Sequence, residues 1–140
     1  MISKAKGGIF LEDLIKNKNL VERFFGYFPS FHDDEVLTVI LSHKGPSVSF
    51  QILASEWING VDGQGRVIRG KTGIVTFKLN GVSDVELDGL SEHNYLLGID
   101  VERYENDNVE VRLIGSTEFG ARIVAKTVMI ESVTDSTIQP

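Results

Sequence analysis

The densest cluster of chemically versatile side chains is the run His32-Asp33-Asp34-Glu35, which lies between an aromatic segment and an apolar one. An imidazole and three carboxylates are groups that bind divalent metals or perform acid–base catalysis. Adjacent residues of an extended chain point to alternate faces, so at most two of these side chains converge. The sequence favours a structural role, in which one aspartate bonds local backbone at a turn and His32 is structural.

The rest of the chain offers no catalytic motif. His43 and His93 are isolated beside expected turns, and the segment 115–119 lacks the G-x-S-x-G spacing of a nucleophile elbow. Gly63-Gln64-Gly65 lacks the strand–turn–helix setting of a phosphate-binding loop. The absence of cysteine excludes disulfides, thiol chemistry and thiolate zinc sites. We therefore expect no enzymatic activity, no metal and no cofactor.

Two features suit a surface that binds another protein. Trp57 begins a glycine-rich segment, where an exposed indole can anchor an interface, although a Trp that caps the end of a sandwich fits equally well. Acidic residues recur at positions expected on outward faces, where an ordinary solvated surface is the alternative. Four of them, on strands expected to be neighbours, could share one face that steers a basic partner: Glu86, Asp88, Asp100 and Glu102.

An aromatic cluster precedes the acidic run and has two interpretations. Its members are Phe24, Phe25, Tyr27, Phe28 and Phe31. Aromatic side chains beside a helix usually pack into the core, and we favour that role. The alternative is a wall of a small-molecule pocket inside a β-sandwich or barrel.

Composition narrows the class of partner. The 140 residues are 41% hydrophobic and 24% charged, which is typical of one soluble domain spanning residues 1–140. The formal net charge of −6 argues against binding to nucleic acid or anionic membranes, which repel an acidic surface. No apolar run reaches the roughly 18 residues of a membrane span, and no signal-peptide core follows the first lysines. We expect a cytoplasmic protein.

Two regions with different periodicity are visible. Residues 10–31 form a helical and aromatic segment, in which Asn19 and Glu22 have the spacing of a capping box. Gly26 suits the left-handed residue that ends a helix, and Pro29 prevents continuation.

Residues 35–133 form the antiparallel β region. Residues 35–42 are apolar on both faces, which predicts a central strand, and they form a hairpin with residues 48–54. Residues 57–72 predict a long mobile loop or a loosely held hairpin. Asn80-Gly81 predicts a turn or bulge before the next strand. The run 119–133 is too long for one straight strand, so we expect a bend near Ala125.

These segments predict an α+β protein that is mainly β. A short N-terminal helical segment packs on an antiparallel sheet or sandwich of about seven to eight strands. The absence of helices between the later strands argues against a parallel α/β fold.

Residues 25–37 resemble the entry motif of a bacterial immunity-protein family, immunity protein 50. The motif is a Phe-His-Asp-x-Glu run, represented here by Phe31, His32, Asp33 and Glu35. Later segments resemble the middle strands of the family, and the resemblance spans residues 24–133. It implies a protein that binds and neutralises a cognate toxin domain in the producing cell, without catalysis. It assigns no toxin-contacting residues, and it leaves the motif either structural or functional.

Three hypotheses follow. The first is a cytoplasmic immunity protein, monomeric or homodimeric, that occludes a cognate toxin of basic character. The second is a β-sandwich or barrel that binds a small molecule against the aromatic cluster. The third is a metal-dependent enzyme centred on His32, Asp33 and Glu35. The acidic balance, the lack of a catalytic motif and the resemblance favour the first.

Overall fold

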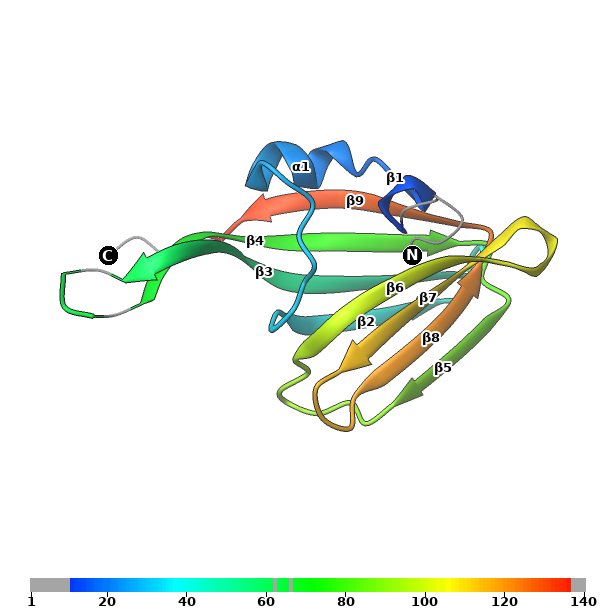
Figure 1. Cartoon of the computed structure of the whole chain (residues 1–140). Helices are drawn as coiled ribbons and strands as arrows, with labels where there is room; N and C mark the ends of the chain where they lie inside the picture. Colours follow the sequence, from blue (N-terminus) through cyan, green and yellow to red (C-terminus); the bar gives the residue numbers. More distant parts are fainter. Residues whose placement is uncertain (1–10, 62, 66, 137–140) are drawn as a thin grey trace.

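The strand-rich chain folds into two sheets with a short helix beside the larger one, as the computed structural model in Figure 1 shows. The structure describes residues 11–61, 63–65 and 67–136. The five-stranded sheet has the order β1 (Ile15–Lys16), β9 (Thr127–Asp135), β4 (Val67–Asn80), β3 (Ser47–Val61) and β2 (Glu35–Ser42). The four-stranded sheet has the order β5 (Asp84–Asp88), β8 (Gly120–Ala125), β7 (Asn108–Gly115) and β6 (Leu96–Tyr104). The predicted α+β, mainly β class is confirmed.

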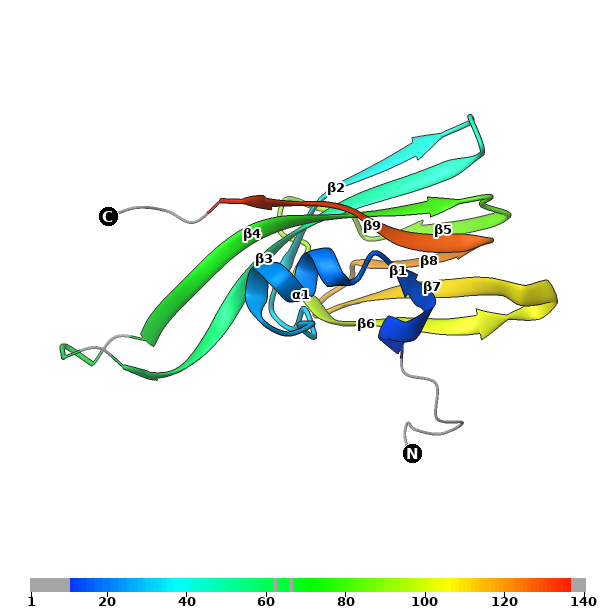
Figure 2. The same cartoon turned by 90° about the horizontal axis from the view of Figure 1, so that it is seen from above.

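Strand pairing is antiparallel throughout the described residues except between β1 and β9, which run parallel. The second sheet crosses in front of the first, and the two face each other over a shared core (Figures 1 and 2). None of the helices among the described residues is long and apolar enough to span a membrane.

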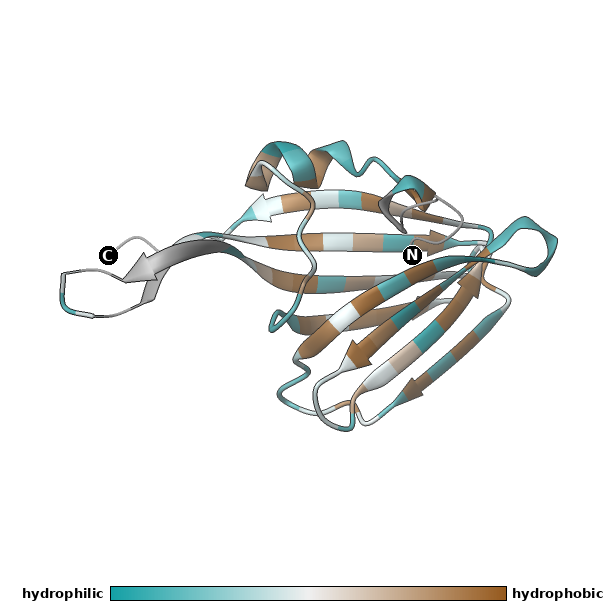
Figure 3. Cartoon of the chain, viewed as in Figure 1, coloured by the Kyte–Doolittle hydropathy of each residue, from teal (hydrophilic) through white to brown (hydrophobic). Residues whose placement is uncertain are grey.

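Alternation along the strands builds that core, and it is visible as alternating colours in Figure 3. Phe50 and Ile52 on β3 and Val75 and Leu79 on β4 are completely buried, as the period-two pattern predicted. Phe77 stacks on Phe50 with 4.8 Å between ring centroids. The second sheet contributes valines, leucines and isoleucines from its inner face to the same cluster. Burial of apolar side chains from both sheets therefore holds the layers together.

The N-terminal segment lies along the β9 side of the first sheet. It contains a 3-10 turn (Leu11–Leu14), β1 and the helix α1 (Asn19–Phe25), which buries Val21 and Phe25. Gly26 ends α1 with φ of 86°, as predicted. The capping-box prediction is wrong, because Lys18 occupies the N-cap and makes no side-chain capping bond. Backbone carbonyls of Asn17 and Lys18 accept from the first helical N–H groups instead.

The prediction of a central strand at Glu35–Ser42 is also wrong. This segment, β2, pairs only with β3 within a sheet and forms the edge of the five-stranded sheet. Its apolar side chains remain substantially exposed, at 41% for Leu37, 57% for Ile40 and 58% for Leu41. An apolar run on both faces indicates a strand, but it does not reveal how many neighbours that strand has.

Three further predictions concern the connections. Residues 57–72 fall mainly within β3 and β4, which extend as one long hairpin beyond the second sheet (Figure 1). Asn80-Gly81 does not turn a hairpin, since β4 pairs with β3 and β9 while β5 pairs with β8. The chain there passes from one sheet to the other. The predicted bend near Ala125 is confirmed, because Lys126 separates β8 in one sheet from β9 in the other.

Candidate functional site

The outer face of the four-stranded sheet carries two rows of mostly charged side chains, which we call the charged face. Residues directly opposite one another on paired strands project from the same side of a sheet. The register gives a first row across β5, β8, β7 and β6 of Glu86, Arg122, Arg112 and Asp100. The second row, in the same strand order, is Asp84, Val124, Glu110 and Glu102.

The four acidic residues singled out in the sequence thus lie on one face, but their strands are not neighbours as expected. Glu86 and Asp88 belong to β5, whereas Asp100 and Glu102 belong to β6, at opposite edges of the sheet. The strands β8 and β7 pair between them and bring two arginines to the centre. The face is therefore acidic along its edges and cationic along its middle, rather than uniformly acidic.

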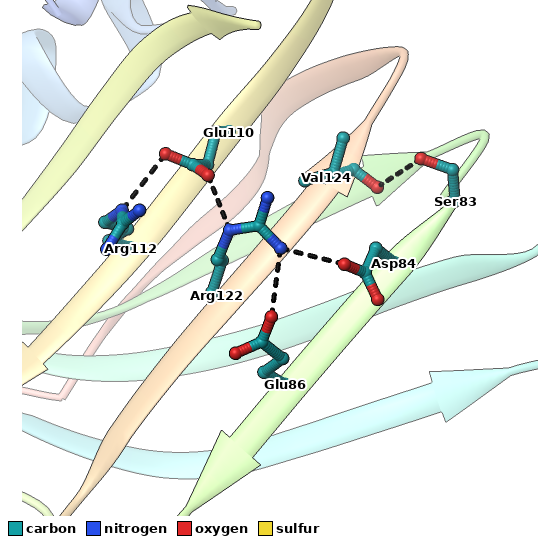
Figure 4. A network of polar contacts seen from close by, with 7 residues as sticks. All are labelled: Ser83, Asp84, Glu86, Glu110, Arg112, Arg122 and Val124. Carbon is teal, nitrogen blue, oxygen red and sulfur yellow. Dashed lines mark hydrogen bonds and ion pairs between the residues drawn. The ribbon is translucent and has the colours of Figure 1, made fainter.

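A network around Glu110 organises the middle of the charged face (Figure 4). The Arg122 guanidinium donates through Nε to Glu110 Oε2, and through Nη1 to Asp84 Oδ2 at 2.8 Å and Glu86 Oε2 at 3.1 Å. Arg112 Nε donates to Glu110 Oε1 at 3.0 Å. Glu110 is only 6% exposed, and both of its carboxylate oxygens accept a hydrogen bond from an arginine. Three strands are tied together by these charge-assisted bonds.

The network keeps Glu110, Arg112 and Arg122 ionised. Burial opposes the charged form of Glu110, but hydrogen bonds from Arg112 and Arg122 outweigh it and lower the pKa of that carboxyl. Hydrogen bonds to Glu110 and then to Asp84 raise the pKa of Arg122, which also lies over the ring of Tyr104 at 5.4 Å from the centroid. Glu110 and Arg122 therefore form an ionised, hydrogen-bonded centre of the charged face at neutral pH.

Arg122→Ala is expected to destabilise the protein clearly more than Arg112→Ala. Arg122 contacts three carboxylates and its side chain is 19% exposed, whereas the Arg112 side chain is 52% exposed. Removal of Arg122 leaves the buried Glu110 with one solvent-exposed partner, and loss of a partner from a buried ion pair is strongly destabilising. Urea denaturation midpoints would measure both changes. Equal shifts for the two variants would contradict the central role given to Arg122.

Three carboxylates of the charged face are left free of such pairing. Among the described residues Asp88, Asp100 and Glu102 form no ion pair. A groove of about 310 Å³ lies on the β5 side of the charged face, and its lining includes Glu86, Asp88, Arg112, Gly120 and Arg122. Gly120 opens space between the β5 carboxylates and Arg112. The carboxylates that form no ion pair, rather than the groove with its two arginines, suit cationic side chains of a partner.

The motif at residues 31–35 occupies a different place, the junction between the two sheets. Asp33 N–H donates to the Leu96 carbonyl at 2.8 Å, and Leu96 N–H donates to the Asp34 carbonyl at 2.8 Å. Val36 N–H donates to the Asn94 carbonyl at 2.9 Å. These backbone hydrogen bonds join the start of β2 to the start of β6, so the motif connects the first sheet to the second.

His32 Nε2 lies 3.5 Å from Asp33 Oδ2, whereas Phe31 and Glu35 of the motif have other neighbours. Phe31 is buried edge-on against Phe77, with 5.6 Å between ring centroids. His32 Nδ1 lies 3.0 Å from the Leu97 carbonyl, and Glu35 lies 3.9 Å from the ring of His93. Asp33 is exposed with φ of 66°. Across the described residues no three histidine, aspartate or glutamate side chains gather as metal ligands.

Asp34, the variable position of the motif, is its buried carboxylate. Its Oδ1 accepts from Ser55 N–H at 3.2 Å, and the residue is 7% exposed. Burial is the main cause that raises its pKa to about 7, while the Ser55 bond lowers it and the charge of Asp33 adds to the rise. From the sequence we expect one aspartate of the run to bond local backbone at a turn, but Asp34 instead accepts from Ser55 on β3, 21 residues away in the chain.

The remaining candidates from the sequence are Trp57 and the aromatic cluster. Trp57 lies on β3 opposite Arg69, in the hairpin that extends beyond the second sheet, and its side chain lies outside the described part of the structure. Its role as an anchor stays a prediction. In the aromatic cluster Phe25 and Phe31 are buried, whereas Tyr27 is 39% exposed. This burial supports the core interpretation.

A crevice of about 190 Å³ does lie beside the aromatic cluster, lined by Phe28, Phe31, Phe77 and neighbouring residues. It is smaller than the roughly 300 Å³ at which small-molecule sites begin. The small-molecule hypothesis therefore gains little from it.

Sequence reasoning missed Glu110, Arg112 and Arg122. Alternation in Val109–Ile114 and in the β8 segment would have put their side chains on outward faces, but only the register shows that they meet.

The fold and this face define a class of small β-rich proteins, in which two sheets share a core and the outer face of one carries charged side chains. Within it, the chain belongs to the immunity protein 50 family, whose model matches residues 17–135. The resemblance seen in the sequence is thereby confirmed, and it places the chain among immunity proteins, whose role is to neutralise a toxin.

Two other comparisons, with curated proteins and with solved structures, gave the following results. A search of curated proteins found no match. Among solved structures the chain is similar to a crystal structure of an uncharacterized protein from Neisseria gonorrhoeae. The two are 15% identical with a TM-score of 0.48, over 72% of this chain and 92% of that one.

Proposed function

We propose that this chain binds a cognate bacterial toxin domain in the cytoplasm and blocks it by occlusion, with the charged face as the contact surface. Membership in the immunity family supports a toxin partner. The observation that favours this face is the set of carboxylates without an ion pair at both edges of a paired sheet, Asp88 on β5 and Asp100 and Glu102 on β6. A partner with exposed lysines or arginines complements them.

The mechanism is physical rather than chemical. The Glu110 network fixes the side chains at the centre, so little conformational entropy is lost when a partner docks. The free carboxylates at the edges attract a basic surface and accelerate the encounter. Occlusion then requires only that the bound immunity protein covers the toxin's working surface.

Protection in cells tests the function itself. The chain would be co-expressed with each toxin domain encoded beside its gene, and growth would be compared with cells that carry the toxin alone. Survival together with a stable purified complex supports neutralisation by binding. Failure to bind or protect against every such toxin would refute it.

Charge reversal at Asp100 and Glu102 tests the contact surface. Asp100→Lys with Glu102→Lys is expected to slow association with that toxin domain about tenfold or more at low salt, because steering by rim charges acts mainly on the association rate. Stopped-flow measurements at low and high salt would show the effect shrinking as salt screens it. Asp13→Lys with Glu131→Lys makes the same change in net charge outside the charged face and serves as the control. Equal slowing by both double variants would move the interface elsewhere.

A further inference from the structure

The edge of β2 is an unprotected sheet edge. Its first residues are covered, since Glu35 bridges to Tyr95 and Val36 N–H donates to Asn94. Beyond them, the backbone of residues 37–42 faces no further strand among the described parts of the chain. A register shift at Leu37 marks the change, and residues 38–42 then pair regularly with β3. An extended row of backbone donors and acceptors is therefore open to another strand.

The other sheet edges differ in the way natural proteins guard such positions. The edge strand β5 carries Asp84, Glu86 and Asp88, and β6 carries Asp100 and Glu102. Charges of this kind discourage edge-to-edge pairing. Residues 36–42 of β2 contain no charge and no proline, and Ile40 and Leu41 are more than half exposed on opposite faces. In Figure 2 the β2 end of the first sheet extends away from the second sheet.

The charges at the two ends of β2 indicate which strand fits there. Glu35 begins the strand, whereas His43 and Lys44 follow its end. When two copies of β2 pair antiparallel over residues 37–42, the covered Glu35 of each lies beyond the paired stretch, near the His43-Lys44 turn of the other. The uncharged middle then meets an identical uncharged middle, so that Val39, Ile40 and Leu41 cover one another. A second copy of the chain would thus bond the free backbone groups, cover the apolar side chains and bring opposite charges near each other.

We propose that two copies of this chain pair through the free edge of β2, antiparallel about a two-fold axis near Val39, so that the two five-stranded sheets become one continuous sheet. Antiparallel pairing about a two-fold axis is the closed arrangement that uses the same strand twice. The surface involved lies on the first sheet, so it leaves the charged face of the second sheet free. The proposal does not depend on which surface the toxin contacts.

Ile40→Lys tests the pairing, with Leu90→Lys as the matched control. The two side chains are almost equally exposed, at 57% and 58%, but Leu90 lies outside the strands. Sedimentation velocity over a wide range of protein concentration would measure self-association. We expect Ile40→Lys to raise the dimer dissociation constant about tenfold or more, and Leu90→Lys to leave it unchanged. Thermal unfolding followed by circular dichroism would confirm that both variants fold.

Disulfide trapping gives an independent readout, because the chain contains no cysteine. Single cysteines at Val39, Ile40 or Leu41 would be oxidised gently, with Leu90→Cys as the control. At least one β2 position is expected to form a covalent dimer, since paired residues across antiparallel strands come within disulfide range. A wild-type chain that stays monomeric at high concentration would overturn the proposal. So would self-association that survives Ile40→Lys, or an edge that binds only the toxin.

Discussion

Phe77→Ala is expected to lower the free energy of unfolding by about 4 kcal/mol, among the larger effects that one substitution can have. Phe77 is 1% exposed and stacks on Phe50, and its ring also meets the edge of Phe31 from the segment that links the two sheets. Truncation therefore removes apolar contacts to the first sheet and to the junction at once. The cavity left behind adds to the loss, because its rigid walls relax only partly.

Phe28→Ala is the control for this expectation. Phe28 also packs edge-on against Phe31, with 5.8 Å between ring centroids, but it is only half-buried. Chemical denaturation of both variants should show a loss for Phe28→Ala that is less than half of the loss for Phe77→Ala. Comparable losses would mean that the core between the sheets contributes no more than the segment that covers it.

The alternation that buries Phe50 and Phe77 was readable in the sequence, because a strand with one buried face repeats every two residues. The same logic misplaced β2, since an apolar run on both faces fits a central strand and equally an edge that awaits a partner. A pattern of apolar residues indicates which side chains favour burial. The neighbours of a strand depend instead on pairing between segments that are distant in the sequence.

The charged face is a second case in which the local sequence did not reveal which strands are neighbours. Glu86 and Asp100 were recognised as outward-facing acids, but β8 and β7 separate their strands. The intervening Arg122 gives the face its centre, and its three carboxylate partners lie 12 to 38 residues away in the chain. No local pattern encodes such a meeting. The register of four paired strands brings these side chains together, and that register is set only when the whole sheet forms.

Asp34 should make the protein less stable as pH rises from about 4 to about 7. Its folded-state pKa is about 7, raised mainly by burial above the ordinary aspartate value of 3.8. Between these values the folded state holds a proton that the unfolded state has released, so the free energy of unfolding falls as pH rises. The loss is complete once the pH exceeds the folded pKa, and it amounts to about 2 kcal/mol after allowance for solvent screening.

Asp34→Asn should remove this dependence. The amide oxygen can still accept from Ser55 N–H, which now donates to Asp34 Oδ1, and the neutral side chain mimics the protonated acid at every pH. The variant should match the wild type near pH 4 and exceed its stability near pH 8. Urea denaturation at several pH values between 4 and 8 would measure the difference.

Asp33→Asn is the matched control, because Asp33 is exposed and asparagine tolerates its positive φ of 66°. This variant should keep most of the wild-type slope. A flat profile for Asp33→Asn, or a wild-type slope that survives Asp34→Asn, would assign the titration to another group. A loss of toxin binding by Asp34→Asn without loss of stability would make the motif part of the interface. Stability and binding measured on one variant therefore separate a junction that holds two sheets together from a surface that contacts a toxin.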